Sequence, residues 1–339
     1  MHLTELLGQP KAVNLLQRAL SGGRLAHAYL FIGPDGVGKA TAARAVAATL
    51  LCREEITSAP CSRCPGCLKF ASGNHPDFLP IRPDGAVIKI DQIRELKKAL
   101  IFPPLEANLR VTLLEEAHTM RREAANSLLK LLEEPPPGNL LLLTADEAEP
   151  LLPTIISRCQ VIPFSPLPVA ISTEILQRLH PDLDQDGVRT LAALAGGSPG
   201  RIKGMNHQEL LQLHRDLLDG LLTAHDSEAD RVEAALGLAA RIARISDGLE
   251  TLLDLLRIFC KDVMVSWCRP AATSNDHHQA QILGRARERW NLTELSDSIG
   301  AIDFALRALA RNCNRQLVCE VLLLKLLAGP AGQQAISIQ

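Results

Sequence analysis

The sequence is poor in aromatic residues, in clustered basic residues and in long apolar runs. Aromatic residues make up 3% of the 339 positions, so the cores must be built from Leu, Ile, Val and Ala. The formal net charge is −2 and there is no long basic run, which argues against a strong stand-alone DNA binder because phosphate contacts need clustered Lys and Arg. No apolar run reaches the roughly 18 residues of a membrane helix. The N-terminus also lacks the charged start and apolar stretch of a signal peptide, so we expect a cytoplasmic protein without membrane contacts.

The composition is otherwise that of an ordinary folded protein. Hydrophobic residues make up 47% of the chain and charged residues 22%, which is typical of globular domains. A chain of 339 residues is long for one domain, so two or three domains are expected.

The first half of the sequence alternates strand-like and helix-like segments. Alternation of this kind predicts an α/β fold with a mostly parallel sheet covered on both faces. We expect this domain to span residues 1–166, followed by short helices over 167–206 and an all-helical domain over 207–339. The apolar runs AYLFIG, DFLPIR, LRVTLLEEA, NLLLLTAD and QVIPFS are the expected strands, and KATAARAVAATLL, DQIRELKKAL and RREAANSLLKLLEE are the expected helices.

A glycine-rich segment, GPDGVGK at 33–39, nearly spells a phosphate-binding loop. An apolar strand precedes it and a helix follows, which is the context that this motif requires. The backbone N–H groups of Gly33, Gly36 and Gly38 would curl around phosphates at the start of the helix, and Lys39 would reach the outer phosphates. The segment therefore predicts a site for ATP or ADP with Mg²⁺. The other interpretation is a glycine-rich turn of the kind that commonly joins a strand to a helix.

Two positions that usually bind Mg²⁺ depart from the pattern. Ala40 stands where a Ser or Thr hydroxyl is expected, and Thr41 points about 100° away on the helix, so Thr41 suits an inner phosphate. At the end of the LRVTLL strand, P-loop ATPases carry an acid that holds Mg²⁺ and a Glu that positions water. Glu115 takes the metal position with a longer side chain than Asp, and Glu116 is the candidate to position water. Without the loop upstream, these two acids would read as a solvated turn.

Four of the nine cysteines, Cys52, Cys61, Cys64 and Cys67, lie within sixteen residues. Four thiolates at these spacings suit tetrahedral Zn²⁺ in a closed, structural site, so we predict a zinc module over about 52–75. An iron–sulfur cluster uses similar spacings, although the sequence shows no redox partner. Unligated core cysteines are the remaining alternative, and four thiols this close would invite oxidation.

Taken together, these segments resemble the clamp-loader branch of the AAA+ proteins, to which subunits of bacterial DNA polymerase III belong. The resemblance runs through LLGQPKAVNLLQRAL, the glycine-rich loop, the four cysteines, GNHPDF, EEAHTM, EAANSLLKLLEEPPPGN, LLPTIISRCQ and GGSPGR. It covers nearly all of residues 1–205 and continues weakly into ARNCNRQLVCEVLLLKLL. It implies an AAA+ P-loop domain with a zinc module, a small helical lid and an all-α collar that oligomerises.

The resemblance also implies roles for individual residues. Arg158, in the SRC motif, matches the arginine finger that reaches into the ATP site of a neighbouring subunit. Such a finger contributes roughly 10³–10⁵ in rate. Arg201 matches a sensor of the γ-phosphate in its own site, and Thr144 stands at the first sensor position. Without the flanking residues, Arg158 would read as a surface arginine in an ordinary loop.

These residues favour a subunit that scaffolds the AAA+ ring, lends Arg158 to a neighbour and helps load the sliding clamp onto primed DNA. Its own ATP hydrolysis is expected to be weak or absent, and it is not the polymerase catalytic subunit. The implied partners are the gamma/tau and delta subunits, the sliding clamp and primed DNA. One alternative is an active ATPase motor, either gamma/tau-like or helicase-like. Another is a zinc-bearing interaction protein whose loop is a relic.

Overall fold

The protein is described by a computed structural model of residues 2–23, 25–148, 151–202, 206–223, 227–245, 248–268 and 277–332. The chain divides into two compact units. Unit 1 contains residues 1–181 and 195–201, and unit 2 contains residues 182–194 and 202–339. The expected division into a lid at 167–206 and a collar at 207–339 stays a prediction.

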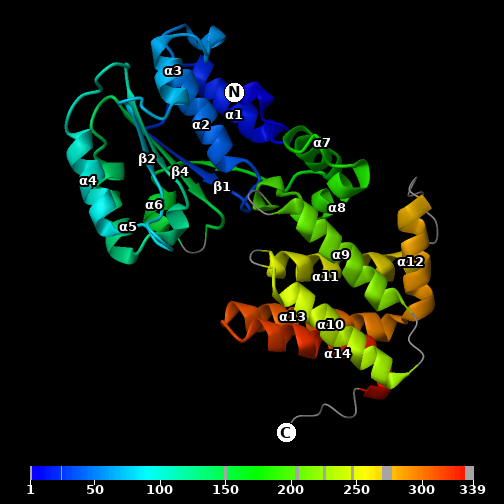
Figure 1. The fold of residues 1–339 in the computed structure, drawn as a ribbon. Coiled ribbons are helices and arrows are strands. Elements are labelled where there is room, and N and C mark those ends of the chain that lie inside the picture. The colour runs from blue at the N-terminus through cyan, green and yellow to red at the C-terminus, as the bar shows by residue number, and fades with distance from the viewer. Residues whose placement is uncertain are drawn as a thin grey trace. The chain divides into compact units, whose positions relative to one another are not determined.

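Unit 1 is built on a five-stranded sheet in which all neighbouring strands are parallel (Figure 1). The strand order is β2-β3-β4-β1-β5. Each of the five apolar runs named from the sequence forms a strand, which confirms the predicted parallel α/β fold. The strands are β1 (Ala28–Ile32), β2 (Phe78–Ile81), β3 (Arg110–Leu114), β4 (Asn139–Ala145) and β5 (Gln160–Pro163).

Helices cover both faces of this sheet. The three helices expected from the sequence are α2 (Lys39–Leu50), α4 (Ile90–Leu100) and α5 (Arg122–Glu133). Figure 1 shows α4 and α5 on one side of the sheet and α1 and α2 on the other. The remaining helices of unit 1 are α1 (Pro10–Ser21), α3 (Pro65–Ala71), α6 (Pro153–Ile156) and α7 (Val169–Leu179), with short 3-10 turns η1 (Leu3–Glu5), η2 (Ile56–Ser58), η3 (Ala117–Thr119) and η4 (Pro199–Ile202, whose last residue belongs to unit 2).

The core of unit 1 consists of two apolar layers separated by the sheet. Successive side chains of a strand point to opposite faces, so Phe31 packs in the layer of α1 and α2 while Leu30 packs in the layer of α4 and α5. In the same way Leu142 and Leu143 of β4 enter different layers. Strands buried on both faces read as continuous apolar runs, which is why the strands were visible in the sequence.

The sheet order determines where a ligand site can form. In parallel sheets the carboxyl ends of the strands lie at one edge, and ligands bind there at the point where the strand order reverses. Here β1 lies between β4 and β5. The loops that follow β1 and β3 therefore meet the carboxyl end of β4 at one edge. These segments carry the glycine-rich segment, the Glu115–Glu116 pair and, within β4, Thr144.

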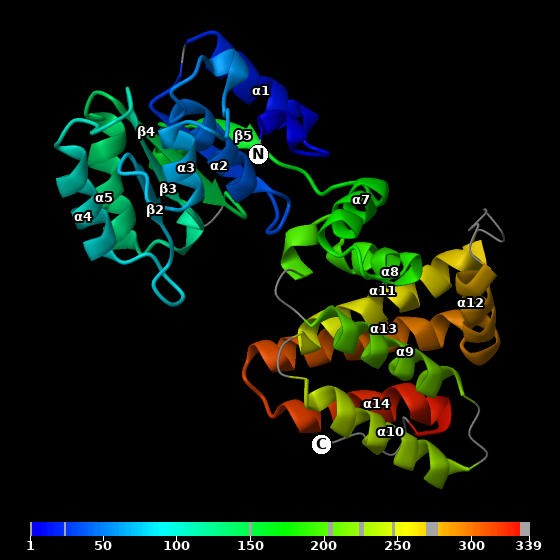
Figure 2. The same ribbon diagram turned by 45° about the horizontal axis from the view of Figure 1, so that its top comes forward.

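Unit 2 is all helical. Helix α10 packs along α14, and α11 packs along α13, α9 and α12 (Figure 2). Asn206, Ser227 and Asn291 cap their helices by accepting a hydrogen bond from a first-turn N–H group. Among the described residues, every helix is too short or too polar to cross a bilayer. The helices are α8 (Gln185–Ala195, whose last residue belongs to unit 1), α9 (His207–Leu222), α10 (Glu228–Ala243), α11 (Leu249–Cys268), α12 (His277–Arg289), α13 (Leu292–Ala310) and α14 (Arg315–Gly332).

Candidate functional site

The P-loop lysine is buried and fully hydrogen-bonded within unit 1. Lys39 opens α2 directly after Gly38, and its side chain is 6% exposed. The Nζ group donates to the carbonyl oxygens of Gly33 at 2.6 Å and Pro34 at 2.7 Å, and it forms an ion pair with Asp146 Oδ1 at 2.9 Å. A lysine ammonium has three N–H donors, so each of them has an acceptor inside the protein.

Asp146, the acid that pairs with Lys39, comes directly after β4. His118 also contacts this carboxylate, with Nε2 3.6 Å from Oδ2, and His118 Nδ1 accepts a hydrogen bond from the Asp146 backbone N–H at 3.3 Å. The sequence analysis did not name Asp146. Its signal in the sequence was an acid directly after an apolar strand.

Glu115, the predicted metal ligand, is neutralised by two arginines. Its Oε1 forms ion pairs with Arg44 Nη2 and with Arg82 Nε, the latter at 3.2 Å, and its side chain is 16% exposed. Residues four apart lie on one face of a helix, so Arg44 extends from the same face of α2 as Ala40. Mg²⁺ at this carboxylate would have to displace or share two guanidinium groups. The sequence analysis named neither arginine. For Arg44, the sequence signal was its position four residues after Ala40.

The structure brings Glu116 and Thr144 together. The backbone N–H of Glu116 donates to Thr144 Oγ1 at 3.0 Å, and Thr144 is buried. Glu116 has φ 56° and ψ 46°, a left-handed conformation that residues other than glycine rarely adopt. Its side chain is exposed. Backbone of this kind concentrates at functional sites, and the role of Glu116 stays a prediction.

Close packing requires glycine at two positions of the loop, independently of phosphate binding. Gly36 has φ 76°, and a Cβ there would lie 2.5 Å from the backbone N of Arg201. The Gly200 N–H also donates to Gly36 O at 3.0 Å. A Cβ on Gly33 would collide with the carbonyl oxygen of Phe164. Arg201 therefore has its backbone beside the loop and an exposed side chain.

The cysteine cluster has the geometry of a four-sulfur metal site. The Sγ atoms of Cys52 and Cys64 are 3.9 Å apart, those of Cys61 and Cys67 are 4.0 Å apart, and all four lie within 4.8 Å of one another. A tetrahedral ion with metal–sulfur bonds of about 2.3 Å places its sulfur ligands about 3.8 Å apart. The four residues named from the sequence thus converge on a set that can hold a metal ion.

Backbone N–H groups prepare two of these thiols for ligation. The Cys64 N–H donates to Cys61 Sγ at 3.3 Å and the Cys67 N–H donates to Cys64 Sγ at 3.4 Å. Burial acts in the opposite direction, yet these and similar backbone contacts lower the pKa of Cys64 to about 6, and backbone hydrogen bonds also lower the pKa of Cys61. Thiolates are the form that binds metal, so the backbone favours the ligating state at both positions.

Beside this cluster, a buried ion pair holds a loop of exposed apolar side chains. Asp77 is fully buried and Arg110 is 5% exposed, and the two are 3.5 Å apart. The Asp77 carboxylate accepts three backbone N–H groups between 105 and 107, and the Arg110 guanidinium donates to three carbonyl oxygens between 99 and 103. The loop backbone is therefore fixed from inside.

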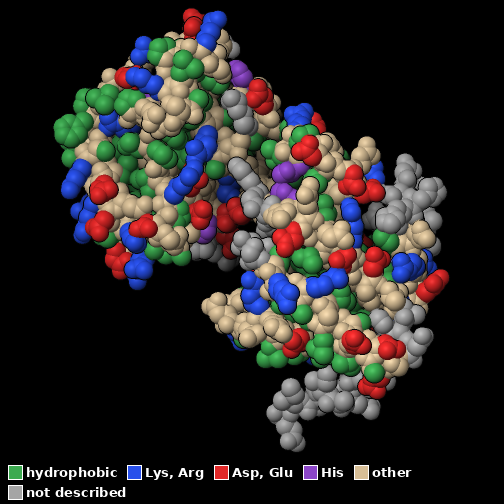
Figure 3. Space-filling view, viewed as in Figure 1, with side chains coloured by type: hydrophobic (Ala, Val, Ile, Leu, Met, Phe, Trp, Pro, Cys, Tyr) green, Lys and Arg blue, Asp and Glu red, His purple; other side chains and the backbone are tan. Residues whose placement is uncertain are grey.

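The side chains of that loop face water. Ile101 is 74% exposed, Phe102 is 66% exposed and Leu105 is 73% exposed, and Figure 3 shows apolar side chains gathered at the α4 edge of unit 1. Apolar groups that a rigid backbone keeps in water mark a surface suited to protein contact.

Arg158 follows the short helix α6 and contacts residues of α5 and α6 in unit 1. Its Nη2 forms an ion pair with Glu133 Oε1 at 2.8 Å, and its Nη1 donates to Thr154 O at 3.0 Å. The side chain is 35% exposed. The structure therefore places this arginine at the surface, away from the contacts of Lys39.

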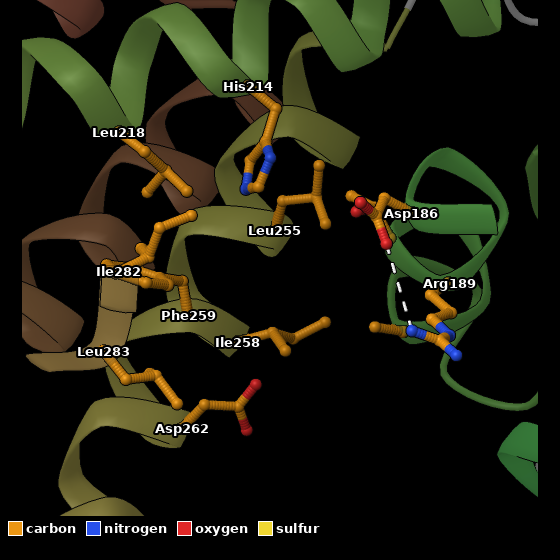
Figure 4. Close-up of a pocket in the computed structure, with 12 residues that line it drawn as sticks. Asp186, Arg189, His214, Leu218, Leu255, Ile258, Phe259, Asp262, Ile282 and Leu283 are labelled. Carbon is orange, nitrogen blue, oxygen red and sulfur yellow. Dashed lines mark ion pairs between the residues drawn. The ribbon is translucent and has the colours of Figure 1, made fainter. Parts of the chain in front are cut away.

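Unit 2 contains a cavity of about 170 Å³ bounded by α8, α9, α11 and α12. Figure 4 shows His214 of α9 and Asp262 of α11 entering it among Leu218, Leu255 and Phe259. Among the described residues, His214 Nε2 is buried without a hydrogen-bond partner. Burial lowers the pKa of His214 to about 4 and raises the pKa of Asp262.

The strand order, the P-loop after β1 and the acidic segment after β3 define a P-loop domain of the AAA+ class. Within this class, residues 8–168 match the family model described as DNA polymerase III, delta subunit. This match, together with the delta' relatives given next, confirms the clamp-loader resemblance named from the sequence, specifically to the delta-prime subunit.

Curated relatives agree with this assignment. The chain is 40% identical over 205 residues to DNA polymerase III subunit delta' of Pseudomonas aeruginosa, which covers 59% of this chain and 62% of that protein. It is 41% identical over 171 residues to subunit delta' of Bacillus subtilis, covering 50% of this chain and 52% of that protein. It is 30% identical over 308 residues to subunit tau of Escherichia coli, covering 84% of this chain and 46% of that protein. The chain thus spans less than two thirds of the length of each of these relatives.

We expect protonation of His214 to destabilise unit 2. Its pKa of about 4 lies below the ordinary value of 6.5, so the folded state favours the neutral ring. The contribution of neutral His214 to the unfolding free energy is present above pH 6.5 and is lost as the pH falls towards 4. The complete loss amounts to about 3 kcal/mol. His214→Gln should flatten the dependence of the unfolding free energy on pH in this window, as measured by urea denaturation. Leu218→Ala, which enlarges the same cavity without a titratable change, should lower stability equally at every pH, and parallel curves for wild type and His214→Gln would contradict the expectation.

Proposed function

We propose that the protein is a clamp-loader subunit of the bacterial DNA polymerase III holoenzyme, of the delta-prime type. The observation that carries this proposal is the identity of 40% over 205 residues to a delta' subunit. In this role the chain scaffolds the AAA+ ring and helps load the sliding clamp onto primed DNA. Bacterial replication takes place in the cytoplasm, where we place the protein.

The chemical contribution of the subunit in this proposal is Arg158. Its guanidinium lies at the surface in the SRC motif, directly after the short helix α6. A guanidinium delivered to a neighbouring ATP site stabilises the charge that develops on the transferred phosphoryl group. Arg158 would therefore accelerate hydrolysis at a site that belongs to another subunit.

The nucleotide site of the chain itself is proposed to hydrolyse ATP weakly or not at all. Gly33, Gly36, Gly38, Lys39 and Thr41 would surround the phosphates, with Thr144 and Arg201 near the outer phosphate. The internal ion pairs of Lys39 and Glu115 compete with phosphate and Mg²⁺ for the groups that a working site needs. Ala40 supplies no hydroxyl to the metal, so Glu116 would have a water to position but no assembled metal centre beside it.

An active motor subunit is the second candidate. The retained glycines and Lys39 favour it, as does the match to subunit tau over 308 residues. The position of Ala40 and the arginine pairs of Glu115 weigh against it, because both remove coordination that Mg²⁺ requires.

The cysteine cluster is proposed to hold a structural Zn²⁺. Cys52, Cys61, Cys64 and Cys67 supply four sulfur donors at tetrahedral spacing, which leaves no open position for catalysis. The ion would fix the segment between α2 and α3 in place of a local apolar core.

The proposed partners are other clamp-loader subunits of the gamma/tau and delta types, the sliding clamp and primed DNA within the assembly. Two apolar surfaces suit protein contacts. The loop of Ile101, Phe102 and Leu105 is one. The other is the outer side of the unit 2 helices, which we propose as the oligomerising collar and which exposes Val232, Leu236, Phe304, Leu317 and Val321.

The isolated chain is expected to turn over ATP negligibly, whereas the reconstituted complex should depend on Arg158. In complexes assembled with gamma/tau and delta subunits, Arg158→Ala should lower the ATPase rate by at least tenfold, given the roughly 10³–10⁵ that such fingers contribute. Size-exclusion chromatography should show unchanged incorporation. Full turnover with full incorporation of the variant would contradict the assignment of Arg158 as the finger. Motor-like turnover by the isolated chain would contradict weak hydrolysis at its own site.

Metal analysis is expected to find one zinc ion per chain. Chelation should loosen residues 50–80, which hydrogen exchange would detect as faster amide exchange there, while the sheet of unit 1 stays protected. Cys64→Ser should reproduce the effect and Cys159→Ser should not, because Cys159 lies outside the cluster. An unchanged exchange pattern after removal of the metal would contradict the structural role.

A further inference from the structure

We infer that Glu133 positions the guanidinium of Arg158 for its neighbour. The inference rests on the proposed function, since it assigns a role in the use of the finger. The ion pair between Glu133 Oε1 and Arg158 Nη2, at 2.8 Å, and the bond from Nη1 to Thr154 O, at 3.0 Å, hold the guanidinium from two elements, α5 and α6.

The place of Glu133 in its helix shows that the acid is not there for local stability. Glu133 is the last residue of α5, where unpaired carbonyl groups give the helix end a negative partial charge. A carboxylate is unfavourable at this end of a helix and a cation is favourable. The Arg158 guanidinium supplies the cation and offsets the repulsion between the Glu133 carboxylate and the helix end. An apolar or basic residue at position 133 would not cause that repulsion.

Part of the Arg158 guanidinium has no hydrogen-bond acceptor among the described residues. An arginine has five N–H donors, and Glu133, Thr154 and Ser157 Oγ, the last at 3.4 Å, account for three of them. The other two have no partner among the residues that the structure describes. A guanidinium that is already held by hydrogen bonds on one side loses less side-chain freedom when its other N–H groups bind a phosphate. An arginine finger offered to a neighbouring subunit requires this preorganisation.

The ion pair is too weak to act as a lock that hides the finger. The Glu133 side chain is 47% exposed and that of Arg158 is 35% exposed, and exposed pairs contribute little to stability. A phosphoryl group that carries several negative charges competes easily for the same guanidinium. Glu133 therefore orients Arg158 without withholding it, and its loss is expected to slow the reaction.

The test is a double-mutant cycle in the complex assembled with the gamma/tau and delta subunits, the sliding clamp and primed DNA. Glu133→Ala should lower kcat for ATP by roughly threefold to tenfold with KM unchanged. It should have no further effect in the Arg158→Ala background, because it acts only through Arg158. Glu133→Gln, which keeps an acceptor oxygen, should restore most of the rate. Glu134→Ala, a change of the adjacent exposed acid, should behave as wild type.

Two results would overturn the inference. One is a wild-type rate for Glu133→Ala in a complex where Arg158→Ala is slow, which would leave the finger assignment intact. The other is an equal loss from Glu133→Ala with and without Arg158, which would indicate a purely structural effect. Failure of Arg158→Ala itself to lower the rate would instead overturn the proposed function.

Discussion

The three hydrogen bonds of the Lys39 ammonium are the constraint on which the carboxyl edge of the sheet depends. A buried ammonium without acceptors would cost several kcal/mol, so the loop carbonyls and Asp146 must stay where they are. Lys39 thereby ties the loop after β1 to the end of β4. In a working nucleotide site the phosphates would supply part of that negative charge. In this structure the Asp146 carboxylate supplies negative charge beside the ammonium.

The departures from the ATPase pattern belong together in this structure. Ala40 lacks a hydroxyl, Glu115 is longer than Asp, and Arg44 extends from the Ala40 face to pair with Glu115. The Glu115 carboxylate is neutralised by guanidinium groups and needs no metal for its own charge balance. Two of the loop glycines, Gly33 and Gly36, are also required by packing against Phe164, Gly200 and Arg201.

Local patterns in the sequence predicted the strands, the main helices and the cysteine cluster. They succeeded because strands buried on both faces are continuous apolar runs, and because four cysteines within sixteen residues can only converge locally. The pairs that define the candidate site were not predicted. Arg44 and Glu115 are 71 positions apart, and Lys39 and Asp146 are 107 apart, so their contact follows from the strand order.

The same limit applies to the buried ion pair of Asp77 and Arg110. The sequence analysis assigned no role to either residue, and only the fold shows that they hold the loop of Ile101, Phe102 and Leu105. Glu133 was likewise part of a motif, LEEPPPGN, whose contact with Arg158 appears only when α5 and α6 are placed together. Motifs located the functional segments, and tertiary structure identified the partners within them.

The central claim is that the P-loop of this chain is charge-balanced by its own residues. Isothermal titration of the isolated chain with ATP, once with Mg²⁺ and once with EDTA, tests it most directly. The account predicts weak or undetectable binding that does not change with Mg²⁺. Tight binding that requires Mg²⁺ would show that the metal displaces Arg44 and Arg82 from Glu115, and would contradict the claim.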